Sequence, residues 1–136
     1  TINYTEEDFE ERVMQISAGK GLPVVYDSVG AVTFDKSMAC LAPRGHMVLF
    51  GQASGLVPSV SVAAIFNKSL YFTRPSLKDY MASRDELLQR SDDLFRWVKS
   101  GELKVHIHDR YPLRDAAEAH RDLEGRKTTG KLLLVP

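Results

Sequence analysis

The fold is decided by residues 24–30, Val-Val-Tyr-Asp-Ser-Val-Gly. The apolar residues at the start of this stretch predict a short buried strand, and the polar residues and glycine that follow predict a turn. The same order returns at residues 47–51, Met-Val-Leu-Phe-Gly, which predict a second buried strand that ends at a glycine. A third strand is predicted at residues 70–73, Leu-Tyr-Phe-Thr, before the Arg-Pro pair at 74–75.

Helical patterns precede and separate these strands. The first helix is expected to begin with Thr5 and Asp8, which have the spacing of a capping box. Strands and helices that alternate along a chain form a parallel sheet covered by helices, so we expect an α/β fold. The residues that recur at helical spacing are Phe9, Val13 and Ile16, then Phe34, Met38 and Leu41, and last a short stretch at 62–66.

The C-terminal part of the chain continues this alternation. Ser83 and Glu86 have capping-box spacing, and the apolar residues after them predict the longest helix of the chain, which ends at Gly101. Three shorter elements are expected beyond it, namely a strand near 105–107, a helix that Asp115 and Glu118 begin, and a last strand at 132–135.

Composition and charge limit the classes of function. The 136 residues carry 18 basic and 18 acidic side chains, so no basic field is available to hold a nucleic acid or an anionic membrane. No apolar run approaches the roughly 20 residues of a membrane helix. The single cysteine, Cys40, fits a reducing compartment and is expected to be a small core residue. We therefore expect a cytoplasmic protein with neither a membrane nor a nucleic acid as its partner.

Candidate ligand-binding residues follow the three predicted strands. In open parallel sheets, ligands bind beyond the carboxyl ends of the strands, which here means residues 27–30, 50–52 and 73–75. Glycine in such a loop lets the backbone approach a flat ring or a phosphate, and Ser28 and Gln52 can hydrogen-bond a ribose or an amide. Each loop taken alone also fits an ordinary turn. The order of several motifs is more specific than any one of them.

The separated motifs occur in an order that is typical of one family. They are Ile2-Asn3-Tyr4, Val25-Tyr26-Asp27-Ser28-Val29-Gly30, Phe50-Gly51, Leu70 to Leu77, Tyr111-Pro112-Leu113 with Ala116 to His120, and Gly130-Lys131-Leu132. Together they resemble quinone oxidoreductases of the zeta-crystallin type, in the medium-chain dehydrogenase/reductase superfamily. The resemblance covers essentially the whole chain.

The resemblance implies a division of the chain into two parts. Residues 1–80 would form the C-terminal half of a Rossmann-type parallel sheet with flanking helices. Residues 81–136 would supply the long helix and a return segment that packs on a GroES-like catalytic domain. Neither that domain nor the phosphate-binding motif G-x-G-x-x-G occurs in this sequence. We therefore expect a C-terminal fragment that is inactive by itself.

The family's cofactor, NADPH, implies roles for residues at both ends of the chain. Tyr4 matches a tyrosine that lines the adenosine phosphate site, although a surface aromatic at a strand end would look the same. Ser28 and Gly30 match the turn beside the adenine and ribose. Arg126 matches an arginine that reaches the 2′-phosphate, a task that suits a planar guanidinium. Near a helix end it would also favour the helix dipole without any ligand.

The two other strand ends match the middle of the cofactor. Gln52 stands where the family often has asparagine, so its longer side chain departs from the family's pattern at the hydrogen bond to the cofactor. For two other side chains a plain alternative exists, with Phe72 in the core and Arg74 as a solvated charge. The matched residues are Phe50, Gly51 and Gln52 along the pyrophosphate and nicotinamide ribose, and Phe72, Thr73 and Arg74 beside the nicotinamide carboxamide.

The histidines suggest a metal only at first sight. His106 and His108 alternate along a predicted strand, so they share a face, and Asp109 is adjacent. The family resemblance gives them no such role, and we expect no metal site. His46 is expected in a turn and His120 on a helix face.

The resemblance implies that the complete protein transfers hydride from NADPH to a quinone or a similar electron-poor acceptor. Other enzymes of the superfamily remain open, namely an enoyl-thioester reductase or a zinc-independent alcohol dehydrogenase. A non-catalytic role, crystallin-like or RNA-binding, also remains open. We further expect a homodimer through strand 69–74, because an apolar edge strand presents unpaired backbone groups to a second chain.

Overall fold

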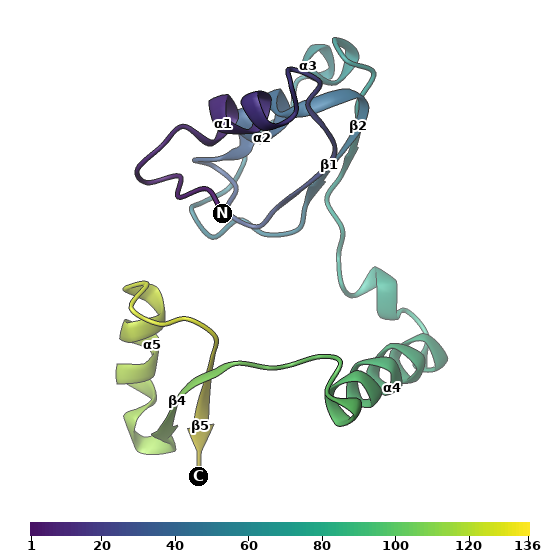
Figure 1. Cartoon of the computed structure of the whole chain (residues 1–136). Helices are drawn as coiled ribbons and strands as arrows, with labels where there is room; N and C mark the ends of the chain where they lie inside the picture. Colours follow the sequence, from purple (N-terminus) through teal and green to yellow (C-terminus); the bar gives the residue numbers. More distant parts are fainter. The chain divides into compact units, whose positions relative to one another are not determined.

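The computed structural model describes all of residues 1–136, which divide into two compact units, Thr1–Tyr80 and Met81–Pro136 (Figure 1). Each unit contains its own parallel sheet, of three strands in the first and two in the second. No helix of the chain is both long and apolar enough to cross a membrane.

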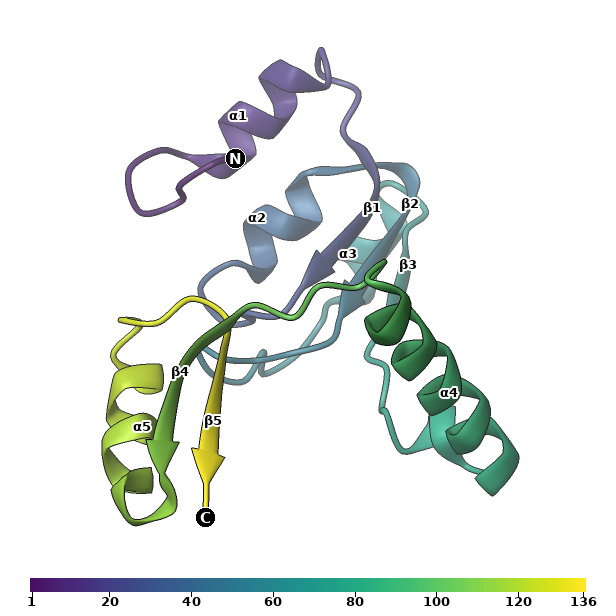
Figure 2. The same cartoon turned by 60° about the horizontal axis from the view of Figure 1, so that its bottom comes forward.

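The first unit alternates helices and strands as expected. Its sheet has the order β1-β2-β3, with all neighbours parallel, so β3 lies at one edge (Figure 2). The elements are α1 (Phe9–Ile16), β1 (Leu22–Asp27), α2 (Phe34–Ala39), β2 (Leu41–Leu49), α3 (Val62–Phe66) and β3 (Tyr71–Thr73), and the short 3-10 helix η1 (Asp79–Met81) stands at the boundary with the second unit.

The register of this sheet sorts its residues into two faces. Val25, Met47 and Phe72 lie side by side across the strands and pack into the core. One residue further along, Tyr26, Val48 and Thr73 form the next row and point to the opposite face, because side chains alternate along a strand. The buried core consists of Phe34, Met38, Leu41, Met47, Leu49 and Leu70.

The start of α1 differs from the expected capping box. Asp8 itself is the N-cap, because its carboxylate accepts hydrogen bonds from the N–H groups of Glu10 at 2.9 Å and Glu11 at 3.4 Å. Thr5 instead donates its hydroxyl to the side chain of Asn3 at 2.8 Å. The predicted helix is therefore real, but it begins three residues later than Thr5 suggested.

The junction of α2 and β2 also differs from the prediction. Leu41 was assigned to the helical face, but it is the first residue of β2, which is longer than the predicted strand at 47–50. The Nζ of Lys68 donates to the carbonyls of Ala39 and Leu41, both at 2.8 Å, and so satisfies acceptors at the C-terminal end of α2. An irregularity between Leu22 and Val24 in the pairing of β1 with β2 lets the longer strand fit.

The second unit begins with the predicted long helix. The capping box at Ser83 and Glu86 is confirmed, with both bonds at 3.2 Å, and Gly101 closes the helix in the left-handed conformation at a φ of 79°. The elements are α4 (Arg84–Ser100), β4 (Ile107–Pro112), the 3-10 helix η2 (Leu113–Asp115), α5 (Ala116–Glu124) and β5 (Lys131–Val135).

Two predictions in the second unit were wrong in detail. The strand expected near 105–107 begins only at Ile107 and runs to Pro112, because its parallel pairing with β5 extends over that range. Asp115 stands at the N-cap of α5 but makes no capping bond with its side chain. The turn of η2 that precedes α5 leads into the helix in its place.

Candidate functional site

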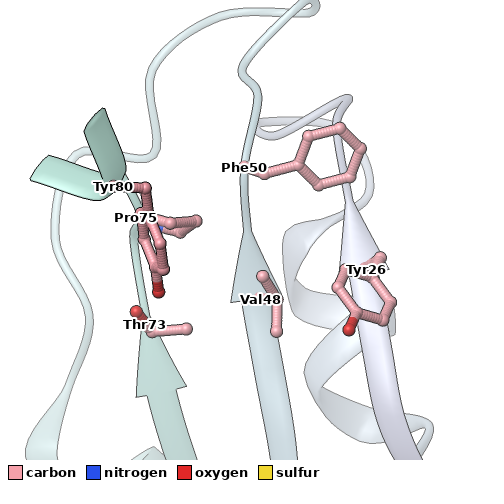
Figure 3. A pocket seen from close by; sticks show the side chains of 6 residues that line it. All are labelled: Tyr26, Val48, Phe50, Thr73, Pro75 and Tyr80. Carbon is pink, nitrogen blue, oxygen red and sulfur yellow. The ribbon is translucent and has the colours of Figure 1, made fainter. Parts of the chain in front are cut away.

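A pocket of about 430 Å³ lies at the carboxyl ends of the three strands of the first unit. Figure 3 shows Tyr26 and Phe50 along one side, Pro75 and Tyr80 along the other, and Val48 between them. Thr73 completes the lining, which therefore draws on all three strand ends.

The walls of this pocket are mainly aromatic. The rings of Tyr26 and Phe50 meet edge to face, with centroids 6.4 Å apart and an interplanar angle of 69°. The two residues are 72% and 53% exposed, so their rings are open to a ligand. Flat apolar surfaces of this kind suit a planar ring, whereas the Thr73 hydroxyl offers a hydrogen bond at the pocket wall.

A second pocket of about 240 Å³ lies beside the loop that follows β1. Tyr4 and Phe9 form its N-terminal side, where their rings meet edge to face at 6.5 Å. Ser28 also lines this pocket, together with Asp27, Thr33 and Ser37, and the hydroxyls of Thr33 and Ser37 donate to the carboxylate of Asp27. It therefore combines aromatic surface with a few polar groups, as small-molecule sites commonly do.

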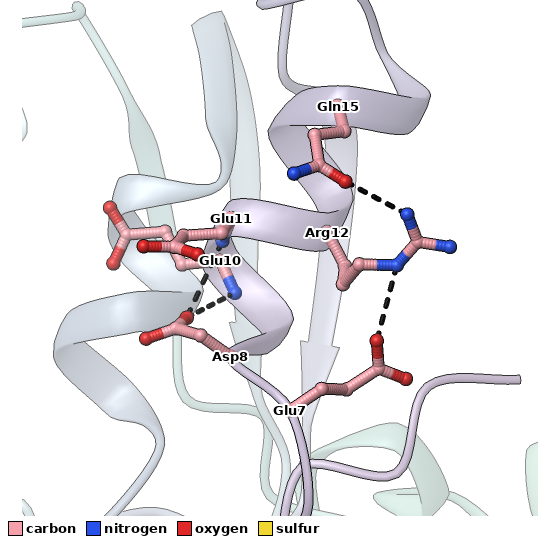
Figure 4. A network of polar contacts seen from close by, with 6 residues as sticks. All are labelled: Glu7, Asp8, Glu10, Glu11, Arg12 and Gln15. Atoms are coloured by element: carbon pink, nitrogen blue, oxygen red, sulfur yellow. Dashed lines mark hydrogen bonds and ion pairs between the residues drawn. The ribbon is translucent and has the colours of Figure 1, made fainter.

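Polar contacts on α1 hold the helix that carries Phe9 (Figure 4). Nε of Arg12 pairs with Glu7 at 3.1 Å, and the same guanidinium donates to Gln15 at 2.8 Å. Lys36 on α2 forms an ion pair with Asp8, which links the two helices. These charged groups are largely open to solvent, so their ion pairs contribute little to stability.

The loops after β1 and β2 are locked together. Ala53 donates its N–H to the carbonyl of Ser28 at 3.1 Å, and Ser54 donates both its N–H and its hydroxyl to the carbonyl of Val29, each at 2.7 Å. The backbones approach so closely that a Cβ on Gly51 would lie 2.6 Å from the Ser28 carbonyl oxygen. The predicted residues Ser28 and Gly51 are therefore brought together by the fold.

Gly30 and Gln52 meet at the same junction. Gly30 has a φ of 88°, in the region that favours glycine, and a Cβ there would lie 2.8 Å from the carbonyl oxygen of Gly55 and 3.0 Å from Cα of Gln52. Glycine is thus required at this position by both conformation and space. Gln52 itself is half-buried beside it.

Asp27 organises the loop after β1, a role that the sequence did not reveal. The residue is only 4% exposed. The N–H groups of Val29 and Gly30 donate to its Oδ1 at 2.8 and 3.0 Å. The hydroxyls of Thr33 and Ser37 each donate to its Oδ2 at 2.8 Å. Burial alone raises the pKa of the Asp27 carboxyl, but the hydrogen bonds that it accepts outweigh this and lower that pKa below its ordinary value.

The segment after β3 divides its residues between the core and the surface. The ring of Phe72 packs edge to face on Phe34, with centroids 6.0 Å apart, so only the backbone of Phe72 is left for a ligand. Thr73 lines the larger pocket. The guanidinium of Arg74 is exposed and donates to the carbonyl of Pro75 at 3.1 Å. Of the three predicted residues, only Thr73 directs its side chain into that pocket.

Arg126 belongs to the second unit. It follows α5, has a φ of 55°, and its backbone N–H donates to the carbonyl of Leu123 at 3.2 Å. Its side chain is exposed, as a ligand contact and a solvated charge both require. The role in binding a 2′-phosphate stays a prediction.

Comparison with known proteins identifies the family of this chain. The sequence profile of a family described as zinc-binding dehydrogenase matches residues 1–134. The chain belongs to the zinc-binding dehydrogenase family. This assignment agrees with the resemblance inferred from the motifs, and the expected α/β fold is confirmed.

Zinc-binding dehydrogenase relatives match almost the whole chain. Quinone oxidoreductase 1 of Escherichia coli (strain K12) is 49% identical over 138 residues, which cover 99% of this chain and 42% of the relative. A 2-haloacrylate reductase of Burkholderia sp. is 44% identical over 138 residues, which cover 100% of this chain and 41% of that relative. The crystal structure of Escherichia coli quinone oxidoreductase complexed with NADPH superimposes on this chain with a TM-score of 0.93 at 48% sequence identity. The match covers 99% of this chain and 42% of the crystallised one. The chain thus spans about two fifths of the length of these relatives.

Zinc is part of the family's description, and the side chains that could bind it are few and scattered in this chain. No group of three or more His, Cys, Asp and Glu side chains could hold a metal ion. His108 accepts a hydrogen bond at Nδ1 from the backbone N–H of Thr129 at 3.4 Å. Cys40 is 2% exposed, and burial raises the pKa of its thiol, which disfavours the thiolate that binds metal.

Proposed function

We propose that the complete protein containing this chain is an NADPH-dependent oxidoreductase that transfers hydride to a quinone or a similar electron-poor acceptor. The observation that carries the proposal is the close match to an Escherichia coli quinone oxidoreductase whose crystal structure is described as a complex with NADPH. The pockets at the carboxyl ends of the strands support it, because ligands of doubly wound folds bind there.

In this proposal the smaller pocket holds the adenosine end of NADPH. The ring of Tyr4 offers a flat apolar wall, and the hydroxyl of Ser28 offers a hydrogen bond to the ribose. Gly30 keeps the loop close to the neighbouring loop, where a side chain would obstruct the backbone. Arg126, from the second unit, is assigned to the 2′-phosphate.

The larger pocket is assigned to the nicotinamide end. Phe50 supplies an aromatic wall, while Gly51 and Gln52 continue its loop along the pyrophosphate and ribose. The hydroxyl of Thr73, with the backbones of Phe72 and Arg74, would hydrogen-bond the carboxamide. NADPH supplies the hydride when it is bound. The residues of this chain bind and orient the ring and exclude water from it.

An electron-poor alkene is a second candidate acceptor. The Burkholderia relative, 44% identical over the chain, is named for the reduction of 2-haloacrylate. Such an acceptor and a quinone share the property that matters, which is a polarised carbon that accepts hydride.

The two structural units support the proposed division of labour. The first, Thr1–Tyr80, contains the Rossmann-type strand ends and is assigned to the nucleotide-binding domain. The second, Met81–Pro136, is assigned to the return segment that packs on the catalytic domain. A cytoplasmic location stays a prediction of the sequence.

A homodimer through strand 69–74 is also part of the proposal. Within the chain, β3 pairs with β2 only, so its other side has backbone groups that a second copy could pair with. Tyr71 is 59% exposed and stacks on His46 with ring centroids 4.5 Å apart. A twofold contact of this edge with its own copy would be self-complementary.

The test uses the complete protein with NADPH and a simple benzoquinone, and follows the loss of the absorbance of the reduced nicotinamide. We expect oxidation that depends on both protein and quinone, and tighter binding of NADPH than of NADH. A parallel reaction with 2-haloacrylate distinguishes the two acceptor classes. If the protein binds NADPH but neither acceptor causes its oxidation, the protein is a cofactor-binding protein and the proposed oxidoreductase activity is refuted.

A further inference from the structure

The buried carboxylate of Asp27 has only neutral hydrogen-bond donors around it. Two are backbone N–H groups of the loop after β1, and two are hydroxyls, of Thr33 at the N-cap of α2 and of Ser37 within α2. Burying a charge costs free energy, and an apolar residue would fill the same place in the core. What an apolar residue would not do is hold the two N–H groups. This specific ability points to a role in fixing the geometry of the loop.

The loop at 28–32, which is bonded to the Asp27 carboxylate, is in turn hydrogen-bonded to the loop at 50–55. Val29 and Gly30 bind to the carboxylate through N–H, and the carbonyl of Val29 accepts two hydrogen bonds from Ser54. The hydroxyl of Ser54 also accepts a hydrogen bond from the N–H of Val32 at 3.1 Å. The backbone carbonyl of Asp27 in turn accepts from the N–H of Phe50 at 2.9 Å. One residue is therefore bonded to both loops.

We propose that Asp27 is a positioning residue for the cofactor, because its carboxylate fixes the loop at 28–32 and, through it, the loop at 50–55. Ser28 and Phe50 lie on these loops and line the smaller and the larger pocket. The proposal rests on the proposed function, in which those pockets receive the two ends of NADPH. Asp27 also lies along the smaller pocket, but both oxygens of its carboxylate already accept hydrogen bonds from the loop and from α2, so it acts through the loops.

The expected effect follows from the population of the binding-competent loops. The apparent dissociation constant rises by the inverse of the fraction of molecules with the competent arrangement. Without the carboxylate, the N–H groups of Val29 and Gly30 lose their acceptor, and the loop gains alternative conformations. If the competent arrangement falls to about a tenth of the molecules, the Kd for NADPH rises about tenfold.

Two substitutions in the complete protein separate positioning from mere stability. Asp27→Ala removes the acceptor. Asp27→Asn keeps Oδ1 for the two N–H groups and turns an amide toward the hydroxyls of Thr33 and Ser37, which can accept as well as donate. Asp35→Asn is the matched control, because it neutralises an exposed carboxylate on α2, the helix that carries Ser37. NADPH binding is titrated at a temperature where circular dichroism finds every variant folded.

We expect Asp27→Ala to raise the Kd for NADPH about tenfold with kcat at saturating NADPH nearly unchanged, and Asp27→Asn and the control to stay within about twofold. A lower melting temperature of Asp27→Ala with an unchanged Kd would overturn the proposal and leave Asp27 a structural role only. If the alanine variant does not fold, Asp27→Ser serves, because it retains one acceptor. An intermediate rise in the Kd of Asp27→Ser for NADPH supports the positioning role, and an unchanged Kd overturns it.

Amide hydrogen exchange gives a readout that needs no cofactor. The proposal requires that Asp27→Ala lose protection at residues 28–32 and 52–55 while β1 and β2 keep theirs. Uniform loss, or no loss, contradicts it. Should the unmodified protein bind no NADPH, the proposed function fails, and the exchange pattern still decides whether Asp27 positions the loops.

Discussion

Replacing Gly51 with alanine tests whether the two loops are as tightly locked as the structure indicates. The new Cβ would lie 2.6 Å from the carbonyl oxygen of Ser28 and 3.0 Å from its Cα. The carbonyl would have to move by about 0.8 Å to reach the 3.4 Å of an ordinary van der Waals contact. The obstructing atoms are backbone, and the Ser28 carbonyl is held by Ala53, so the loop cannot yield as a side chain would.

The expected cost is that of overpacking, about 2 kcal/mol. A loss of this size lowers the melting temperature of the complete protein by about 4 to 8 °C. The displaced loop should also weaken NADPH binding, because Ser28 lines the smaller pocket. Thermal unfolding by circular dichroism and a cofactor titration measure the two effects. The neighbouring change Gln52→Ala, which meets no such obstruction, should alter the melting temperature by less than about 2 °C. An unchanged melting temperature for Gly51→Ala would refute the locked-loop geometry.

Three further predictions concern charge, cofactor choice and assembly. Because the pKa of Asp27 is lowered in the folded state, its contribution to stability is present above the ordinary pKa of 3.8 and is lost as pH falls through the lower, folded pKa. The melting temperature of Asp27→Asn should therefore fall less steeply with acid than that of the unmodified protein. Arg126→Ala should weaken NADPH much more than NADH in a binding titration, and equal weakening would assign Arg126 to structure. Tyr71→Pro removes a backbone donor from β3 and should give a monomer by light scattering, and a variant that stays dimeric would exclude this interface.

The sequence predicted those parts of the fold that depend on local pattern. The apolar runs that become β1 and β3, and the capping box of α4, are short-range signals, and the structure contains them as expected. The start of β2 at Leu41 was missed because it depends on the pairing of Leu41 with Leu22 of β1, a contact between distant parts of the sequence. Lys68, also distant in sequence, binds the carbonyls of Ala39 and Leu41 at the same junction. The extent of β4 was missed for a similar reason, since its pairing with β5 decides it.

The candidate site divides in the same way. Positions directly after the strands were predictable, since the carboxyl ends of parallel strands must share one edge. That the side chain of Phe72 faces the core while Thr73 faces the pocket required the register of the sheet. The organising role of Asp27 depends on donors six and ten residues further along the chain, Thr33 and Ser37, whose hydroxyls gave no signal by themselves.

The two rows of side chains across the first sheet have a consequence for how such a protein can change. Val25, Met47 and Phe72 hold the core, whereas Tyr26, Val48 and Thr73, each the next residue on the same strand, face away from it. Mutations in the second row can therefore reshape the surface offered to a ligand while the packing beneath is kept. Residues that determine stability and residues that determine ligand specificity thus alternate along the same strands. The ligand-facing residues can change during evolution while selection preserves the core-facing ones.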